Sequence, residues 1–223
     1  MIATLLLSCS TGVQTTGANK KSISTHRSVA LLPFQIYLGP RLQHAEKFTD
    51  SEKLELQHYL SLALQQHLYE AIQKKQKRFP LSVNIQSVAL TNQMLASQKI
   101  SFAQLFGDDK TAICKLLGVD AIIFPQAIFG KSDPSSLNNL LNKGSMAAHF
   151  TICDSKNSNP LWTFDKELSD NVLKNNNAII SIPNDMPEAY YTAENKYQQV
   201  LVPWIPIIDV LSQNFFANFP YKK

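Results

Sequence analysis

The chain has 223 residues, of which 44% are hydrophobic and 17% charged, and its formal net charge is +4. This composition supports one substantial core and excludes a disordered chain, and no apolar run reaches the ~18–20 residues of a membrane-spanning helix. A mild charge, without a basic stripe interleaved with aromatic residues, argues against a nucleic-acid-binding protein.

The N-terminal sequence MIATLLLSCST resembles a bacterial lipobox, in which an apolar segment and a small residue precede a cysteine. In lipoproteins of that kind a signal peptidase cuts before the cysteine, whose thiol receives a diacylglycerol and whose new amine is acylated, for example with palmitate. The resemblance implies that residues 1–8 are the remainder of a signal peptide and that Cys9 is the lipidation site. Because no Lys or Arg precedes Cys9, we expect the signal to begin upstream of Met1. The alternative is an apolar tail with an incidental cysteine.

The segment after this cysteine is small and polar, reading STGVQTTGANKKSIST over residues 10–25. We therefore predict that residues 9–27 are the lipidated cysteine and a flexible tether. Lysines rather than an aspartate follow the cysteine, and Ser10 next to it resembles the outer-membrane sorting pattern. These features predict a protein held by its lipid on the periplasmic face of the outer membrane.

The folded part is predicted to begin with a strand over residues 28–34, SVALLPF. Residues 35–48 are predicted to be irregular, with a Gly-Pro turn. A long helix is predicted over residues 51–76, because the side chains of the preceding TDS can cap it. Its apolar residues recur in steps of four, as expected of a helix laid on a sheet: Leu56, Leu60, Leu64, Leu68 and Ile72.

The end of this helix carries a basic run, KKQKR, at residues 74–78. Favourable interaction with the helix dipole explains the run without a ligand, and contact with anionic lipid headgroups is the alternative. His58 and His67 lie on the same helix with no acidic or cysteine partner at ligand spacing. We therefore interpret them as surface or boundary histidines and predict no metal site.

The middle of the chain alternates strand and helix signals. A half-exposed strand is predicted over residues 81–90 and mixed helical structure over residues 92–106. A short helix follows over residues 112–117, closed by Gly118 in the left-handed conformation. The next segment, residues 119–129, is mostly apolar on both faces, which predicts a central strand covered by helices.

A hairpin is predicted from strands over residues 146–154 and 161–164, joined by the turn SKNSNP. His149 belongs to the second face of its strand and has no base-orienting neighbour in the sequence. The first face of that strand is apolar and consists of Met146, Ala148, Phe150 and Ile152.

Two cysteines remain besides Cys9, and both stand in apolar patterns. Cys114 and Cys153 lack the CxxC spacing of a zinc site, so we predict that they are small buried hydrophobic residues. A bridge between them is the alternative if the compartment is oxidising.

The C-terminal part is predicted to contain helices over residues 188–201 and 205–219. The apolar run over residues 200–211, VLVPWIPIIDVL, is too short and too rich in proline to span a bilayer. One interpretation is a helix that faces the core. The other is a patch for a partner or a membrane surface, made of Trp204, Ile205, Phe215 and Phe216. We predict a sandwich domain over residues 28–175 and a helical extension over 176–223 that packs on it.

Three stretches, SVALLPF, LGVDAII and ICDSKNSNPLW, resemble a superfamily of periplasmic lipoproteins. The superfamily includes the GNA-type and DUF799 lipoproteins, curli-secretion lipoproteins, penicillin-binding-protein activators and the N-terminal domain of TolB. Asp154 and Trp162 match its hairpin, whereas the usual turn glycine is replaced here. The resemblance implies an α/β sandwich with a mixed sheet in the order β-α-β-α-β-β-α, like the TolB N-terminal domain.

No catalytic motif, phosphate-binding loop or cofactor fingerprint occurs in the sequence, so no catalytic, cofactor-binding or metal-binding residue is predicted. The leading hypothesis is a non-enzymatic, lipid-anchored envelope component, structural or activating, that contacts an envelope protein partner or forms a homo-oligomer. An accessory subunit of an outer-membrane secretion or transport system is the alternative, and a periplasmic hydrolase is a more remote one. Neither a nucleic acid nor a small-molecule substrate is predicted as a ligand.

Overall fold

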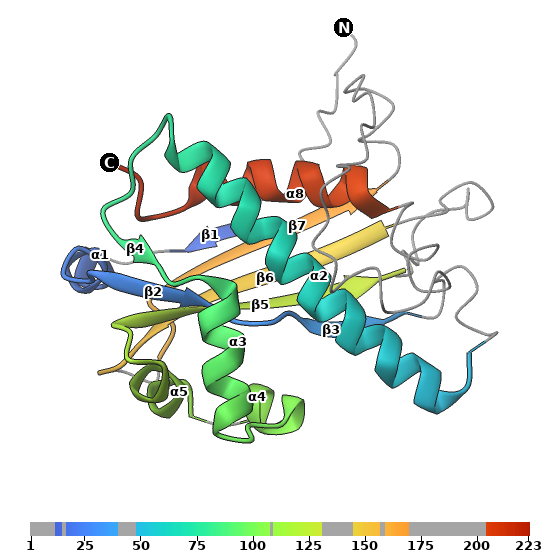
Figure 1. The fold of residues 1–223 in the computed structure, drawn as a ribbon. Coiled ribbons are helices and arrows are strands. Elements are labelled where there is room, and N and C mark those ends of the chain that lie inside the picture. The colour runs from blue at the N-terminus through green and yellow to red at the C-terminus, as the bar shows by residue number, and fades with distance from the viewer. Residues whose placement is uncertain are drawn as a thin grey trace, which may run out of the picture.

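A computed structural model of the chain describes residues 12–14, 17–39, 48–107, 109–130, 145–156, 159–169 and 204–223. Its centre is one seven-stranded mixed sheet in the order β1-β7-β6-β5-β2-β4, with β3 also paired to β5 (Figure 1). The strands are β1 (Gly12–Gln14), β2 (Ser28–Leu31), β3 (Gln35–Leu38), β4 (Asn84–Ile85), β5 (Ala121–Phe129), β6 (Ser145–Asp154) and β7 (Trp162–Ser169). The helices are α1 (Gly17–Ile23), α2 (Asp50–Gln76), α3 (Val88–Ser97), α4 (Phe102–Gly107), α5 (Lys110–Leu117) and α8 (Ile205–Asn218). The predicted α/β sandwich with a mixed sheet is confirmed.

Strand β5 is central, as its two apolar faces predicted. It pairs in parallel with β2 and then with β3 on one side, and antiparallel with β6 on the other. The predicted helix before it is α5, which ends at Gly118 with φ 64° and ψ 33°, the left-handed conformation that glycine adopts at little cost. Asp109 caps the start of α5 by accepting a hydrogen bond from the Thr111 N–H.

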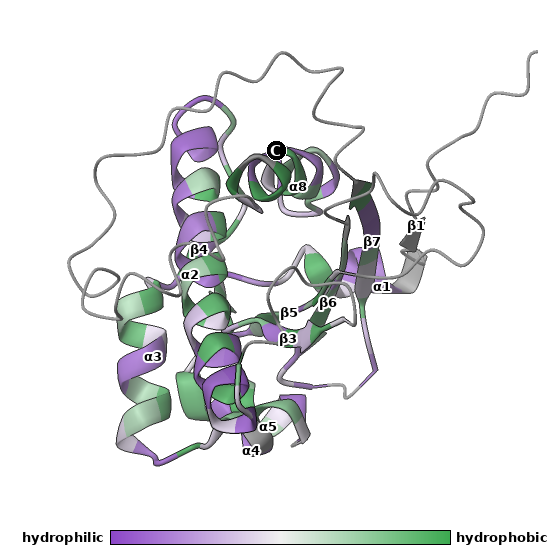
Figure 2. Cartoon of the chain, turned by 90° about the vertical axis from the view of Figure 1, so that its right-hand side faces the viewer, coloured by the Kyte–Doolittle hydropathy of each residue, from purple (hydrophilic) through white to green (hydrophobic). Residues whose placement is uncertain are grey.

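The first face of the sheet is covered by α2 and α8. The predicted stripe of α2 and the predicted apolar face of β6 meet in one core. Figure 2 shows hydrophobic and hydrophilic residues alternating along α2. Thr49 and Glu52 form a reciprocal capping box at the start of α2. Aromatic rings from β6, β7 and α8 fill the far side of this core: Phe150, Trp162, Phe164 and Phe215.

This core corrects the prediction of a C-terminal partner surface. The side chains of Trp204, Ile205, Phe215 and Phe216 are 0–6% exposed within the single chain. The Trp204 ring lies 4.9 Å from that of Phe129. The apolar stripe of α8 packs on the sheet and against α2, so the alternative of a core-facing helix is the right one.

The second face of the sheet is covered over the first half of β5 by α3, α4 and α5, which form a smaller core. Cys114 and Cys153 lie in it as free, buried thiols, and the Cys114 sulfur donates to the Cys153 carbonyl at 3.7 Å. Burial raises the pKa of Cys114 to about 12 and that of Cys153 to about 11. Both therefore serve as small hydrophobic residues, and they form no disulfide with each other.

Three predicted segments differ in the structure. The predicted tether contains β1, which pairs with β7 through backbone hydrogen bonds, and α1, which buries Ile23. The segment predicted to be irregular contains β3, because its alternating residues pair with β5. Helix α3 begins inside the predicted strand over residues 81–90, because Ser87 caps it. The predicted helix over residues 188–201 lies outside the described residues.

Candidate functional site

The second face of the sheet is more exposed beyond Phe124, in the part of the chain that the structure describes. Tyr37 on β3 and Ile128 on β5 are register partners, and they are 44% and 36% exposed. Gln35 and Gln126 lie beside them and are half-buried. Two exposed large hydrophobic side chains on adjacent strands are an unusual feature for a sheet face and are typical of a contact surface.

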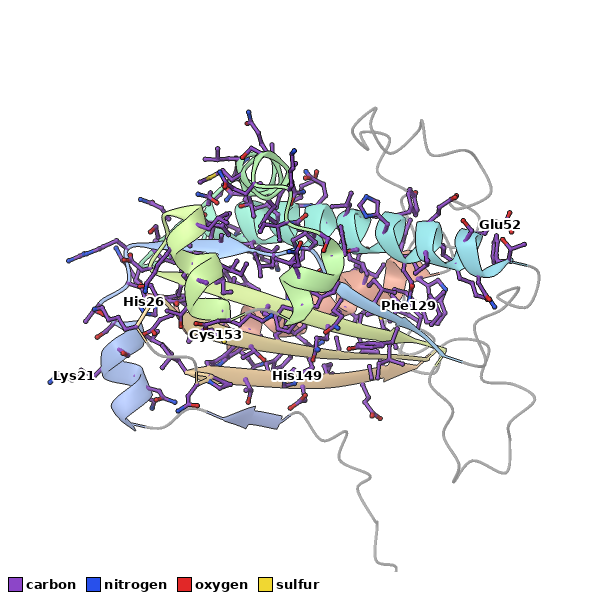
Figure 3. All side chains as sticks on the ribbon, turned by 90° about the horizontal axis from the view of Figure 1, so that it is seen from below. Lys21, His26, Glu52, Phe129, His149 and Cys153 are labelled. Atoms are coloured by element: carbon purple, nitrogen blue, oxygen red, sulfur yellow. The ribbon has the colours of Figure 1, made fainter. Side chains whose placement is uncertain are left out.

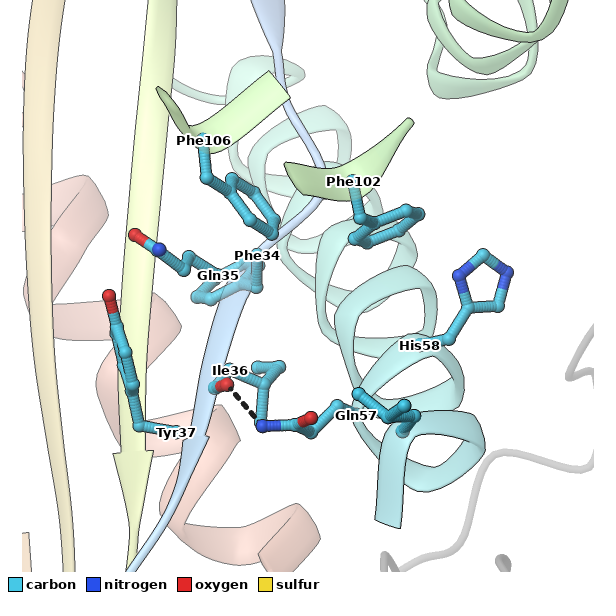
Figure 4. A pocket seen from close by; sticks show the side chains of 9 residues that line it. Phe34, Gln35, Ile36, Tyr37, Gln57, His58, Phe102 and Phe106 are labelled. Carbon is cyan, nitrogen blue, oxygen red and sulfur yellow. Dashed lines mark hydrogen bonds between the residues drawn. The ribbon is translucent and has the colours of Figure 1, made fainter. Parts of the chain in front are cut away.

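A pocket of about 380 Å³ lies next to these side chains, between β3, the first half of α2, and α4. Figure 4 shows Phe102 and Phe106 at its upper end and His58 and Gln57 on the α2 side. The two phenylalanine rings are 5.5 Å apart in a T-shaped arrangement, and the His58 ring lies 4.6 Å from that of Phe102. The lining consists of Phe34, Gln35, Ile36, Tyr37, Leu54, Gln57, His58, Phe102 and Phe106.

Two of the polar side chains that line the pocket, Gln57 and Gln35, are hydrogen-bonded within the protein. The Gln57 side-chain amide donates to the Ile36 carbonyl of β3 at 3.0 Å, so this backbone acceptor has a partner on α2. The Gln126 amide donates to the Gln35 side-chain oxygen at 2.5 Å. Desolvation lowers the pKa of His58, which favours its neutral form. The pocket therefore presents an uncharged, mainly apolar surface, with Leu54 at its edge 68% exposed.

A hydroxyl, an imidazole and a carboxylate line up on the same face of the sheet. His149 Nδ1 lies 2.5 Å from Asp165 Oδ1, and His149 Nε2 lies 2.9 Å from Thr151 Oγ1. This is the order of nucleophile, base and orienting group in a catalytic triad. Thr151, however, is 6% exposed and does not line the described pocket. The set is accounted for as a cross-strand pair, because His149 and Asp165 are register partners of the hairpin.

A second polar cluster is buried where α1, β6 and the C-terminal tail meet. His26 Nδ1 lies 2.6 Å from the Tyr221 hydroxyl, and His26 Nε2 lies 3.7 Å from Asp154 Oδ2. All three residues are at most 6% exposed. Burial lowers the pKa of His26 and raises that of Tyr221, which favours the neutral form of both. The cluster joins the residues after α1 and the C-terminal tail to the end of β6.

The other sequence predictions concern Cys9, the histidines of α2, a metal site and a membrane-spanning helix. Cys9 lies outside the described residues. His67 on α2 contacts Asp209 on α8, with Nε2 2.7 Å from Oδ1, so it serves helix packing. Among the described residues, no group of three His, Cys, Asp or Glu side chains could hold a metal ion. A search of the same residues found no helix with the length and apolar character to cross a membrane.

Sequence reasoning missed the pocket because its walls come from three separate segments. The pairing of Tyr37 with Ile128 joins residues 91 positions apart, and no short-range pattern reveals it. The partner of His149 could have been found. Pairing the two predicted strands across the turn, with Ile152 opposite Trp162, places Asp165 opposite His149.

No family model matches the chain, and no curated protein is similar to it in sequence. Similar solved structures include the lipoprotein GNA1162 from Neisseria meningitidis, with 11% identity and a TM-score of 0.39 over 86% of this chain and 97% of that one. The hypothetical protein CT253 from Chlamydia trachomatis has 12% identity and a TM-score of 0.37 over 88% and 98%. The LpoB C-terminal domain from Salmonella enterica has 8% identity and a TM-score of 0.33 over 64% and 82%.

These neighbours include bacterial lipoproteins of the group that the sequence resembles. At such low identities and TM-scores the likeness assigns the chain no activity and no partner.

Proposed function

We propose that the protein is a non-enzymatic, lipid-anchored component of a bacterial envelope assembly, which binds a protein partner through the pocket and the exposed residues beside it. The observation that carries the proposal is the juxtaposition of Leu54, Tyr37 and Ile128 with the apolar pocket. We call these three residues and the pocket lining the pocket face. Exposed aromatic and aliphatic side chains around a cavity are typical of the centre of a protein–protein interface.

The chemistry of the pocket face favours an apolar protein segment as its occupant. The cavity, about 380 Å³, is at the small end of the range for ligand sites, about 300–1,000 Å³. A small-molecule site also needs polar groups that converge on the ligand, whereas the lining glutamines Gln35 and Gln57 are hydrogen-bonded within the protein. A few large apolar side chains of a partner would fill the cavity and cover Leu54 and Tyr37.

The membrane anchor is a second part of the proposal. Lipidation at Cys9 would place the lipid three residues before β1 begins at Gly12. An extended chain of that length spans roughly 10 Å, so the domain would lie close to the bilayer rather than on a long tether. We propose the periplasmic face of the outer membrane as the location. Intact mass spectrometry of the protein from membranes tests this part, and an unmodified Cys9 would contradict it.

The partner site is tested with a pair of matched substitutions. Leu54 and Leu90 are both exposed, at 68% and 45%, and both lie near the start of a helix, where an aspartate is tolerated. We expect Leu54→Asp to lower partner recovery at least tenfold in crosslinking from intact envelopes, and Leu90→Asp to leave it unchanged. Equal recovery with both variants would contradict the pocket face as the partner site. If the crosslinked species is a ring-sized homo-oligomer, an accessory role in secretion or transport is favoured over an activator.

A further inference from the structure

One end of the molecule carries a concentration of exposed positive charge. Four separate segments contribute to it: α1 with the residues after it, the end of α2, the residues after β6, and the C-terminal tail. Every one of the basic side chains is exposed. We call this set the basic end: Lys20, Lys21, Arg27, Lys74, Lys75, Lys77, Arg78, Lys156, Lys222 and Lys223.

Backbone contacts show that these segments meet. The Lys223 N–H donates to the Pro80 carbonyl at 3.1 Å, which joins the C-terminal tail to the segment after α2. The Asn84 N–H donates to the Arg27 carbonyl at 2.8 Å, which joins that segment to the residues between α1 and β2. The Lys156 N–H donates to Asp154, whose other carboxylate oxygen lies near His26. In Figure 1, α1, β4 and the C-terminus accordingly lie at the same end of the sheet.

The carboxylates of these segments do not neutralise the basic end. Three occur there in the part of the chain that the structure describes: Asp120, Asp154, and Glu70, which lies one turn before Lys74 on α2 and accepts a hydrogen bond from Gln66. Asp120 accepts hydrogen bonds from the N–H groups of Arg27 and Ser28 at 2.7 and 3.0 Å. Asp154 is 1% exposed. Asp120 and Asp154 are turned toward the protein, and Glu70 offsets only one of the ten basic charges, so the outward charge of this end is positive.

The opposite end of α2 is acidic. Asp50, Glu52 and Glu55 lie in its first two turns, and 27 residues of helix separate the two ends by about 40 Å. Figure 3 shows Lys21 and His26 at one end of the molecule and Glu52 at the other. The helix dipole accounts for cations in the last turn of α2. The dipole of α1 likewise fits Lys20 and Lys21 in its last turn, but no helix end accounts for Arg27, for Lys156 after β6, or for the two lysines of the C-terminal tail.

An exposed aromatic residue lies within the basic end. Phe79, directly after Arg78, is 52% exposed, and its ring lies 6.3 Å from that of Phe216. Aromatic side chains surrounded by lysine and arginine are typical of protein surfaces at the headgroup level of a bilayer. A surface for single-stranded nucleic acid would need a series of aromatic platforms instead.

We propose that the basic end binds the anionic headgroups of a lipid bilayer, with Phe79 entering the interfacial layer. This inference goes beyond the proposed function, because it concerns the membrane rather than the protein partner. It does not depend on lipidation of Cys9. Each Lys or Arg near an anionic surface strengthens binding about fivefold, and added salt screens the attraction.

The experiment uses the full chain with Cys9→Ala, so that no acyl chain contributes to binding. We expect it to cosediment with phosphatidylglycerol-containing vesicles, to release in high salt, and not to bind pure phosphatidylcholine vesicles. Lys75→Glu with Lys77→Glu should weaken binding at least tenfold. The control, Lys53→Glu with Lys99→Glu, changes the net charge equally at exposed or half-buried sites away from the basic end and should weaken it less than twofold.

Several results would overturn the proposal: no salt-sensitive binding to anionic vesicles, equal loss in both double variants, or tighter binding to DNA than to the vesicles. Circular dichroism of both variants establishes that they are folded. The pocket face is unaltered in these proteins, so failure here leaves the partner proposal standing. Conversely, an unmodified Cys9 in membranes would not alter the vesicle result.

Discussion

At the scale of single residues, His26 is the clearest case of a titratable group controlled by its surroundings. Its ring is buried, hydrogen-bonded to the Tyr221 hydroxyl, and near the carboxylates of Asp154 and Asp120. Burial lowers its pKa more than these carboxylates raise it, with a smaller lowering by Lys156. The folded protein therefore holds His26 neutral where an unfolded chain would already bind a proton.

This balance predicts a loss of stability in mild acid. Below the ordinary pKa of 6.5, the unfolded state binds a proton that folded His26 does not, so the free energy of unfolding should fall as the pH is lowered. The slope is at most about 1.4 kcal/mol per pH unit for one proton. Urea unfolding at neutral pH and at about pH 5 measures the change. The variant His26→Gln should show a smaller difference, and an equal difference would assign the effect to other groups such as His58.

At the scale of elements, Gly118 sets the direction in which the chain leaves α5 and enters β5. Its φ of 64° is a conformation in which a side chain is strained, although no atom lies within 4 Å of an added Cβ. Gly118→Ala should therefore destabilise the protein by about 1 kcal/mol through backbone strain alone. Gly107 in α4 has equally open space and no positive φ, so Gly107→Ala should be neutral or slightly stabilising. Urea unfolding compares the two, and equal losses would contradict the assignment to φ.

Elements with a local signal could be predicted from the sequence, and those that depend on distant pairing could not. The capped helix α2, the turn at Gly118 and the apolar strand β5 each carry their pattern within one segment. Strands β1 and β3 are four residues or shorter and gain their hydrogen bonds from β7 and β5. The polar sequence of β1 reads as a tether because its stability comes from backbone pairing.

The candidate site shows the same limit. Each wall of the pocket face is an ordinary piece of strand or helix, and only the parallel pairing of β3 with β5 brings Tyr37 beside Ile128. The basic run at the end of α2 was visible in the sequence, together with its possible contact with lipid. Its extension to α1 and the C-terminal tail required the contacts of Pro80 with Lys223 and of Asn84 with Arg27.

At the scale of the whole molecule, α8 completes the core of the first sheet face. Phe215 is fully buried, and its ring lies 4.6 Å from that of Phe150 and 6.0 Å from that of Trp162. Because α8 turns its apolar stripe into the core, the surfaces that we propose for the partner and the membrane are the pocket face and the basic end. The sequence pattern alone is equally compatible with an apolar stripe that faces a partner.

The two interpretations of this stripe predict different responses to truncation. Phe215→Ala should destabilise the folded chain by about 3–5 kcal/mol, because it removes a buried ring and leaves a cavity among the aromatic residues. Phe79→Ala is the matched control at a site that is 52% exposed, and it should cost less than about 1 kcal/mol. Urea unfolding gives both values, and light scattering gives the oligomeric state. If Phe215 lay at an interface between proteins, its truncation would change the oligomeric state while the free energy of unfolding of the monomer stayed near that of the wild type.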